Sequence, residues 1–169
     1  MQRIVIVGPS GSGKSTLGKT LSDKLDIPVT HLDSLFFKAG WVEIEKKELV
    51  EKVTHLISTN EKWIIEGNYS STFPIRLQHC DQVIFLDYPR SLYLFRAIKR
   101  SFKYYGRTRP DMAEGCFERF DFSFFKYVWN FPKRRKNLLA ILNEHSKDKN
   151  NIVILKNTKE LNQYLDTIN

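Results

Sequence analysis

The residues GPSGSGKST, at positions 8–16, set three glycines, a lysine and several hydroxyl side chains at fixed intervals. Their spacing matches the pattern G-x-x-x-x-G-K-[ST], in which backbone amides surround a phosphate. Glycine permits backbone angles that a Cβ forbids, so the amides of such a loop can point inward. In this pattern Lys14 reaches the β- and γ-phosphates, and the hydroxyl of Ser15 ligates Mg²⁺. The alternative is a glycine-rich turn that merely joins a strand to a helix, and the lysine and serine in register argue against it.

The loop is therefore expected to bind ATP together with Mg²⁺. We expect Lys14 to act in catalysis as well as in binding, and Thr16 to donate a hydrogen bond to the α-phosphate. The predicted nucleotide-binding residues of the loop are Gly8, Pro9, Ser10, Gly11, Ser12, Gly13, Lys14, Ser15 and Thr16.

Strand and helix patterns alternate along the chain. An apolar β-branched run, RIVIV, precedes the loop, and the residues after the loop, LGKTLSDKL, have helical spacing. This alternation predicts an α/β fold in which a parallel sheet lies between two layers of helices. Ligands bind at the carboxyl ends of the strands in such sheets, so the loop, Asp33, Glu66 and Asp87 are expected along one edge, although Asp87 precedes a Tyr-Pro turn and is left out of the predicted site. Strands are predicted at 3–7, 27–33, 63–69, 81–87 and 151–155, and helices after the loop and at 47–57, 91–105, 131–145 and 159–168.

Positive charge is concentrated in one part of the chain. The 169 residues carry a formal net charge of +8, and residues 96–136 hold 12 Lys or Arg against 4 Asp or Glu. The rest of the chain is balanced in charge, and the same segment holds 11 of the 22 aromatic residues. A concentrated positive field attracts a polyanion, which can be either a nucleotide or a nucleic acid.

Other features limit the class of protein. No apolar run reaches the roughly 18 residues that cross a bilayer, and the apolar stretch at the N-terminus is too short for a signal peptide. The two cysteines, Cys80 and Cys116, lack metal-ligand spacing, and the four histidines are scattered. We expect a single domain over residues 1–169, in a reduced, cytoplasmic protein with no membrane partner.

Several stretches of the sequence together resemble one family. They are GPSGSGKST, HLDSLFFKAGW at 31–41, WIIEGNYS at 63–70, VIFLDYPRS at 83–91 and the basic segment that follows. These stretches resemble the DNA topology modulation (FlaR-like) proteins, within the adenylate kinase-like superfamily of P-loop proteins. The resemblance implies a three-layer P-loop kinase fold, with a five-stranded sheet of order 2-3-1-4-5 and a mobile lid. The lid would be a basic, aromatic insertion at about 101–130, between the fourth strand and the last helices.

The resemblance also implies roles for three residues outside the loop. Nucleotide kinases end their third strand in Asp-Gly, where the Asp supports Mg²⁺ through water, and Glu66 takes that place here. Asp33 resembles the substrate-binding Asp of shikimate kinase-like enzymes, whose carboxylate contacts an acceptor hydroxyl. Asn157 follows the fifth strand, where the superfamily holds adenine. The alternatives are that Asp33 caps a helix and that Glu66 is a solvated turn residue.

One arginine of the adenylate kinase pattern is missing. That pattern has an arginine close after the third strand, whereas the nearest candidate here is Arg76, several residues later. This departure argues against a nucleoside monophosphate as acceptor. Asp33 is expected near four rings, which suggests a hydroxyl group on a partly flat molecule; the rings are those of Phe36, Phe37, Trp41 and Tyr69.

The basic segment has three interpretations. As a lid, it would bring arginines onto the transferring phosphoryl group, and the candidates are Arg100, Arg107 and Arg134. Most of the aromatic residues between 117 and 131 would then form the core of the lid and its contact with the sheet. As a nucleic-acid surface, the segment would stack its rings on bases. As plain surface, its charge would only keep a helix soluble.

These interpretations predict different functions. The lid predicts an ATP-dependent phosphotransferase that acts on a hydroxyl or phosphate of a small-molecule acceptor. The nucleic-acid surface predicts instead a nucleotide-dependent DNA-binding or topology-modulating protein without kinase activity. The two differ in salt dependence, because contacts to several phosphates of DNA weaken steeply as salt rises.

Overall fold

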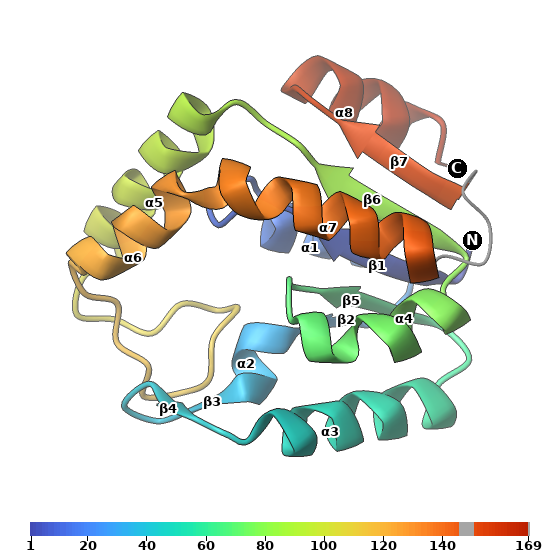
Figure 1. Ribbon diagram of the computed structural model, residues 1–169, viewed down its shortest axis with the longest axis horizontal. Helices are drawn as coiled ribbons and strands as arrows, with labels where there is room; N and C mark the ends of the chain where they lie inside the picture. Colours follow the sequence, from blue (N-terminus) through green and yellow to red (C-terminus); the bar gives the residue numbers. More distant parts are fainter. Residues whose placement is uncertain (146–150, 169) are drawn as a thin grey trace.

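Five parallel strands form the central layer of the protein (Figure 1). The computed structural model describes residues 1–145 and 151–168. The order across the sheet is β2, β5, β1, β6, β7, which in chain order is the expected 2-3-1-4-5, so the α/β fold is confirmed. The strands are β1 (Arg3–Val7), β2 (Val29–His31), β5 (Trp63–Glu66), β6 (Gln82–Leu86) and β7 (Ile152–Leu155).

Helices cover both faces of this sheet because side chains alternate along each strand. Ile4 and Ile6 of β1 pack on one side, in an apolar cluster with α1 (Lys14–Leu25) and α8 (Thr158–Asp166). Val5 and Val7 pack on the other side, with the helices that Figure 1 shows in front of the sheet and below it. The elements of that second layer are α3 (Lys46–Thr59), α4 (Phe73–His79), α5 (Arg90–Tyr104), α6 (Phe122–Trp129) and α7 (Phe131–His145).

The longer helices agree with the sequence predictions, since α3, α5, α7 and α8 lie where periodic patterns were found. Several shorter elements were not predicted, because a segment of one or two turns is too short to show a repeating pattern. None of the helices among the described residues is long and apolar enough to span a membrane. Besides α4 and α6, the unpredicted elements are α2 (Leu32–Phe36), β3 (Phe37–Lys38), β4 (Val42–Glu43) and the 3₁₀ helix η1 (Ser70–Thr72).

A loop over residues 105–121 connects α5 to α6 and lies beside the β3–β4 hairpin (Figure 1). The backbone amide of Gly40 donates to the carbonyl oxygen of Gly115 over 3.0 Å. The indole Nε1 of Trp41 donates to the carbonyl oxygen of Phe117 over 2.8 Å. The expected insertion at about 101–130 thus comprises the end of α5, this loop and α6, which we call the lid segment. Its movement stays a prediction.

Arg76 of α4 holds the turn that follows β5. Its side chain is fully buried, with 0% exposure, and its guanidinium lies 4.6 Å from the ring centroid of Phe73. Nη1 donates to the carbonyl oxygen of Gly67 over 3.0 Å, and Nη2 to that of Tyr69 over 3.3 Å. Arg76 therefore positions the backbone after β5 and does not face a ligand.

Replacing this arginine is expected to destabilise the fold. Arg76→Ala leaves two buried carbonyl groups without their donors, so the free energy of unfolding should fall by about 2–4 kcal/mol. Urea denaturation measures this change. The exposed Lys62→Ala is the control and should stay within about 0.5 kcal/mol of the wild type. An Arg76→Ala protein as stable as that control would show that the two carbonyl contacts contribute nothing.

Candidate active site

The loop between β1 and α1 has the backbone of a phosphate-binding loop. Gly13 adopts a φ of 98° and is the N-cap of α1, so the helix begins at Lys14 with its free amides next to the loop. Gly11 adopts a φ of 86°, and a Cβ there would lie 2.1 Å from the carbonyl oxygen of Tyr93 in α5. Only glycine fits at position 11, because both the positive φ and the short distance to Tyr93 exclude a Cβ.

Asn68 fixes the start of this loop from the neighbouring strand. Its Oδ1 accepts from the backbone amide of Gly8 over 3.1 Å, and its Nδ2 donates to the carbonyl oxygen of Gly8 over 2.6 Å. Lys14 lies across the loop, and its Nζ donates to the carbonyl oxygen of Pro9 over 3.1 Å. Burial lowers the pKa of Lys14, and the negative charges of Glu66 and Asp33 offset part of this effect.

The oxygen-bearing side chains of Ser15, Glu66 and Asp111 meet at one point. Oγ of Ser15 lies 3.1 Å from Oε1 of Glu66, at the end of β5, and 2.8 Å from Oδ2 of Asp111, in the lid segment. Hydroxyl and carboxylate oxygens are the protein ligands that Mg²⁺ prefers, so these residues fit the predicted ion. Within residues 1–145 and 151–168 there is no group of three or more His, Cys, Asp or Glu able to hold a metal alone.

Glu66 also contacts His31 at the end of β2, where Nδ1 and Oε1 are 2.9 Å apart. Burial alone would raise the pKa of Glu66, but the hydrogen bond from His31 and the charge of Lys14 outweigh it, so the pKa is lowered. Burial alone would lower the pKa of His31, but the hydrogen bond and charge of Glu66 reverse this, so the pKa is raised. Glu66 is a buried partner of two polar side chains, and the interpretation of Glu66 as a solvated turn residue is wrong.

Asp33 lies within the short helix α2 and lines the same cavity as Lys14 and Ser15. The N-cap of α2 is His31, so the interpretation of Asp33 as a helix cap is wrong. Its Oδ1 accepts a hydrogen bond of 2.7 Å from the hydroxyl of Tyr69. Burial raises the pKa of Asp33, the charge of Glu66 raises it further, and Tyr69 and Lys14 offset only part of the shift.

The lid segment contributes one neutralised arginine, Arg109, and α5 just before it contributes one available arginine, Arg100. Arg109 is buried. Its Nη1 lies 3.0 Å from Oδ2 of Asp111, and its Nε lies 2.7 Å from Oε2 of Glu118. Arg100 on α5 lies with its guanidinium 5.8 Å from the ring centroid of Phe124, and its buried Nε has no hydrogen-bond partner in the part of the chain that the structure describes. An arginine without a fixed partner can bind an anion without first breaking an ion pair.

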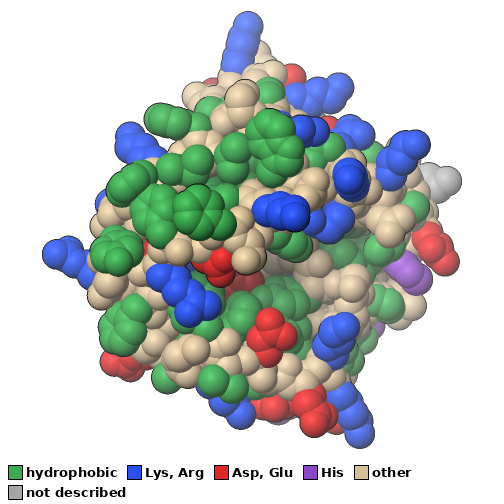
Figure 2. All heavy atoms as spheres, turned by 60° about the vertical axis from the view of Figure 1, so that its left-hand side comes forward, with side chains coloured by type: hydrophobic (Ala, Val, Ile, Leu, Met, Phe, Trp, Pro, Cys, Tyr) green, Lys and Arg blue, Asp and Glu red, His purple; other side chains and the backbone are tan. Residues whose placement is uncertain are grey.

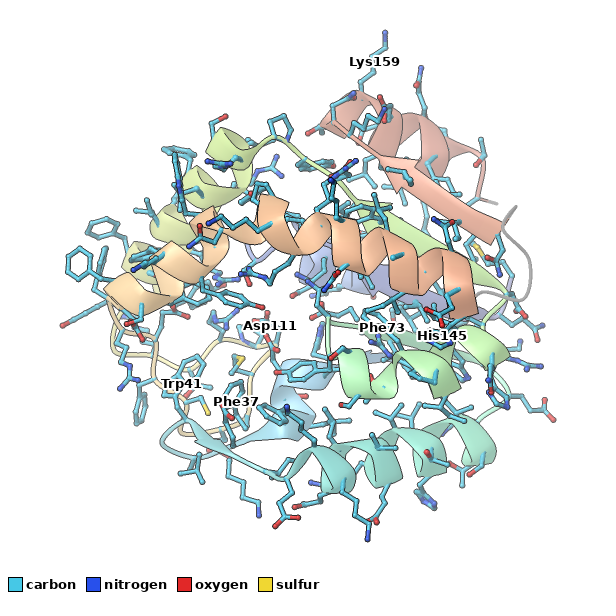
Figure 3. The ribbon with its side chains drawn as sticks, viewed as in Figure 1. Phe37, Trp41, Phe73, Asp111, His145 and Lys159 are labelled. Atoms are coloured by element: carbon cyan, nitrogen blue, oxygen red, sulfur yellow. The ribbon has the colours of Figure 1, made fainter. Side chains whose placement is uncertain are left out.

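These groups surround one cavity of about 450 Å³. The cavity brings together residues of the loop, of α2, of β5 and of the lid segment, including six predicted site residues, of which Ser10 is one. Figure 3 labels Asp111 in the interior beside the lid loop, above Phe37 and Trp41. The predicted site residues outside the loop's backbone that line the cavity are Lys14, Ser15, Asp33, Glu66 and Arg100.

Outside the loop, three predicted site residues do not line this cavity, and within the loop six do not. The six are Gly8, Pro9, Gly11, Ser12, Gly13 and Thr16. Arg107 is exposed. Arg134 covers the ring of Tyr127 with its guanidinium 3.6 Å from the centroid and donates to the carbonyl oxygen of Tyr127 over 2.7 Å. Asn157 is the N-cap of α8, where its side chain accepts from the amide of Glu160 over 2.9 Å. Roles for these residues in catalysis or adenine binding stay predictions.

The expectation that most aromatic residues between 117 and 131 form the core of the lid is wrong. Five of the eight rings between 117 and 131 are exposed, and only Phe131 is buried. Figure 2 shows hydrophobic side chains gathered on one face of the molecule, among Lys and Arg side chains. Apolar density in a sequence indicates burial only when another element covers it, and here α6 has one side open to solvent. The exposed rings are Phe117, Phe120, Phe122, Tyr127 and Trp129.

The site contains residues that sequence patterns did not single out. Asp111 ends the stretch KYYGRTRPD and is 96 positions from Ser15, so no spacing rule connects them. Asn68 and His31 stand in the quoted stretches EGNYS and HLD, yet their partners are visible only in the folded chain. For Asn68 and His31, the one signal in the sequence that could have found them is their position at or just after the carboxyl end of a strand.

Sequence relatives place this site in a known family. A shikimate kinase of Caldicellulosiruptor bescii is 35% identical over 128 residues, which cover 68% of this chain and 72% of that enzyme. The chain belongs to the shikimate kinase family. An uncharacterized protein of Bacillus subtilis, YqaC, is 36% identical over 110 residues, which cover 62% of this chain. This family member spans only 60% of the length of YqaC. No family model matches the chain.

Solved structures agree on the fold of this shikimate kinase family member. The shikimate kinase of Acinetobacter baumannii in complex with shikimate has a TM-score of 0.60 at 17% identity, covering 98% of this chain and 94% of its own. The shikimate kinase of Bacteroides thetaiotaomicron has a TM-score of 0.59 at 15% identity, covering 98% and 97%. A sugar kinase of Janibacter sp. HTCC2649 has a TM-score of 0.54, covering 99% and 94%. None of these relatives is described as a topology modulation protein, so that narrower resemblance stays a prediction.

The contact between His31 and Glu66 makes stability depend on pH. The raised pKa of His31 means that its stabilising contribution is complete below its unfolded pKa of 6.5 and is lost as pH rises through the folded pKa. We expect the free energy of unfolding to fall from about pH 6 to about pH 8 in protein free of nucleotide and divalent cations, and to fall less in His31→Gln. Chemical denaturation across this range measures both slopes. The exposed His55→Gln should follow the wild type, and equal slopes in all three proteins would contradict the assignment.

Proposed function

We propose that this protein is an ATP-dependent phosphotransferase that moves the γ-phosphoryl group onto a hydroxyl of a small acceptor. The observation that supports this most directly is the shared cavity, where Lys14 and Ser15 of the loop face Asp33 and Arg100. The names of the relatives agree, since shikimate kinases transfer phosphoryl groups. The cytoplasmic location expected from the sequence is a further proposal.

The loop and its lysine would hold the nucleotide. Amides at the start of α1 and the ammonium group of Lys14 supply positive charge where the phosphates must lie. Ser15, with Glu66 and Asp111 beside it, would hold Mg²⁺, which supplies charge neutralisation between the phosphate oxygens. Because the protein alone forms no complete metal site in its described residues, nucleotide oxygens would complete the coordination.

Asp33 would take the proton of the acceptor hydroxyl. Tyr69 occupies Oδ1 of Asp33, which leaves Oδ2 for the acceptor and fixes the direction of the carboxylate. The raised pKa of Asp33 brings a carboxylate nearer to the pH at which a general base is most useful. As the acceptor oxygen attacks the γ-phosphorus, its proton passes to Asp33, and the bond to the leaving oxygen of ADP breaks. Arg100 would stabilise the charge on the transferring group.

Removal of the loop lysine tests this function. Lys14→Ala should lower turnover by about 100-fold or more, because the lost charge acts on the transferring phosphoryl group. The measurement is mass-resolved product formation from Mg·ATP and a pool of nucleosides, nucleotides, sugars and cofactor precursors. Lys19→Ala, an exposed lysine of the same helix, should keep wild-type turnover. Unchanged turnover in a folded Lys14→Ala protein would rule out this mechanism.

A second candidate function is binding to single-stranded nucleic acid. The observation that favours it is the exposure of rings on α5 and α6, where Phe102 is 66% exposed and Phe122 is 86% exposed. Figure 2 shows Lys and Arg side chains interspersed with hydrophobic side chains on one face of the molecule. Bases stack on exposed rings while basic side chains contact the phosphates.

Salt dependence tests this second function. Fluorescence anisotropy with a labelled single-stranded oligonucleotide should show affinity that falls by about 10-fold or more between about 50 and 200 mM salt. Phe122→Ala and Phe102→Ala should each weaken binding, since stacking contributes about 1–3 kcal/mol per base. Val42→Ala, which truncates an exposed apolar side chain of β4, serves as the control. Absence of binding at the lower salt concentration would exclude this function.

A further inference from the structure

One wall of the cavity is a continuous row of aromatic rings. The rings of Tyr69 and Phe36 are 4.8 Å apart between centroids, those of Phe36 and Phe37 are 5.1 Å apart, and those of Phe37 and Trp41 are 5.4 Å apart. All four residues line the cavity. Because Tyr69 also donates to Asp33, the row begins at the carboxylate that would contact the acceptor hydroxyl. Such a row favours a planar ring lying a short distance from that hydroxyl.

The charge of the cavity is opposite to that of the whole chain. The chain carries +8, yet its cavity is lined by six carboxylates and four cationic side chains. Figure 2 shows acidic side chains in and beside a hollow on this face. The carboxylates are Asp33, Glu43, Glu66, Asp111, Glu118 and Asp121, and the cations are Lys14, Arg100, Arg109 and Arg119.

Three of the four cationic side chains are already assigned to a role other than binding the acceptor. Lys14 lies on the phosphate-binding loop. Arg109 is neutralised by Asp111 and Glu118 at 3.0 and 2.7 Å. Arg100 is the available arginine that the transferring phosphoryl group requires. The remaining arginine, Arg119, is exposed at the cavity's edge, where water weakens its attraction for an anion.

Three of the carboxylates form no ion pair among the described residues. Asp33 accepts from the neutral hydroxyl of Tyr69, and the nearby charges of Lys14 and Arg109 offset part of its own. The other two are Glu43 of β4, which is exposed, and Asp121, which accepts from the backbone amides of Ser123 and Phe124. Because the carboxylates that line the cavity outnumber its cationic side chains, an acceptor with a phosphate or carboxylate group beside the ring wall would add to an excess of negative charge. A neutral or cationic acceptor would not.

We propose that the acceptor is an uncharged or cationic alcohol that carries a planar ring, of the nucleoside class, and not a phosphate or a carboxylate such as shikimate. This inference rests on the proposed function, because Asp33 and the ring wall are taken as the acceptor end of a phosphotransferase site. Within the shikimate kinase family it separates this chain from enzymes that act on an anionic acid.

Isothermal titration calorimetry in excess Mg·ADP tests the charge of the acceptor. The probes are the four common nucleosides, their 5′-monophosphates and shikimate. At least one nucleoside should bind about 10-fold or more tightly than its own monophosphate and than shikimate, which corresponds to about 1.4 kcal/mol. Phe37→Ala should weaken the binding of that nucleoside by a similar factor. The inference is overturned if every monophosphate, or shikimate, binds as tightly as the nucleosides, or if no nucleoside binds with a Kd below about 1 mM.

A charge reversal provides a matched comparison. Glu43→Lys should raise the affinity for the monophosphate relative to the nucleoside, because it replaces a cavity carboxylate with a cation. Glu45→Lys makes the same change of charge two residues away. Both positions are exposed, but Glu45 does not line the cavity, so this variant should leave the ratio unchanged. Equal shifts in both variants would show that overall charge sets the preference and would overturn the inference.

Product analysis separates this inference from the proposed function. Phosphorylated shikimate or a nucleoside diphosphate, formed by the wild type and lost in Lys14→Ala, would overturn the acceptor class and leave the phosphotransferase intact. Nucleoside binding that weakens in Phe37→Ala, together with no phosphorylated product from any probe with Mg·ATP, would overturn the phosphotransferase and keep the ligand class. A nucleoside monophosphate as product, lost in Asp33→Asn, would support both.

Discussion

The hydroxyl group of Ser15 connects the three parts on which the site depends. Ser15 belongs to the first turn of α1, Glu66 ends β5, and Asp111 lies in the lid segment. Both carboxylates lie within hydrogen-bond reach of the single hydroxyl of Ser15, at 3.1 and 2.8 Å. Carboxylates so close to one another repel, and burial makes that repulsion costly. His31 and Arg109 supply the compensating contacts, to Glu66 and Asp111 respectively. The arrangement therefore concentrates oxygen ligands at one point and keeps them stable before any cation binds.

The same kind of compensation applies to the basic segment at 96–136, which includes the lid segment and the start of α7. Arginines are numerous in this segment, but several of them are occupied in the folded chain. Arg109 neutralises Asp111 and Glu118, Arg134 covers the ring of Tyr127, and Arg135 pairs with Asp87 over 2.7 Å. Arg100 alone among the predicted lid arginines lines the cavity. A basic segment thus surrounds an acidic cavity, and net charge by itself says little about what the cavity binds.

Family membership and site chemistry carry different information about this protein. The likeness to shikimate kinases shows the family and the fold. The row of rings from Tyr69 to Trp41 and the carboxylate of Glu43 line the same cavity as Lys14 and Asp33. A fold is reused among kinases, whereas the acceptor is chosen by the side chains that surround it.

The amino-acid sequence by itself determined the sheet, the loop and one group of site residues. Apolar runs followed by glycine, lysine and serine at fixed intervals are local patterns. Local patterns can be recognised without knowledge of the fold. Glu66 and Asp33 were found because residues at the ends of parallel strands must share one edge. Only the tertiary structure decided that Asp111 meets Ser15, that Asn68 holds Gly8, and that the aromatic residues of α6 face solvent. These features depend on which surfaces meet in space, and contacts between residues 60 or 96 positions apart leave no periodic trace in the chain.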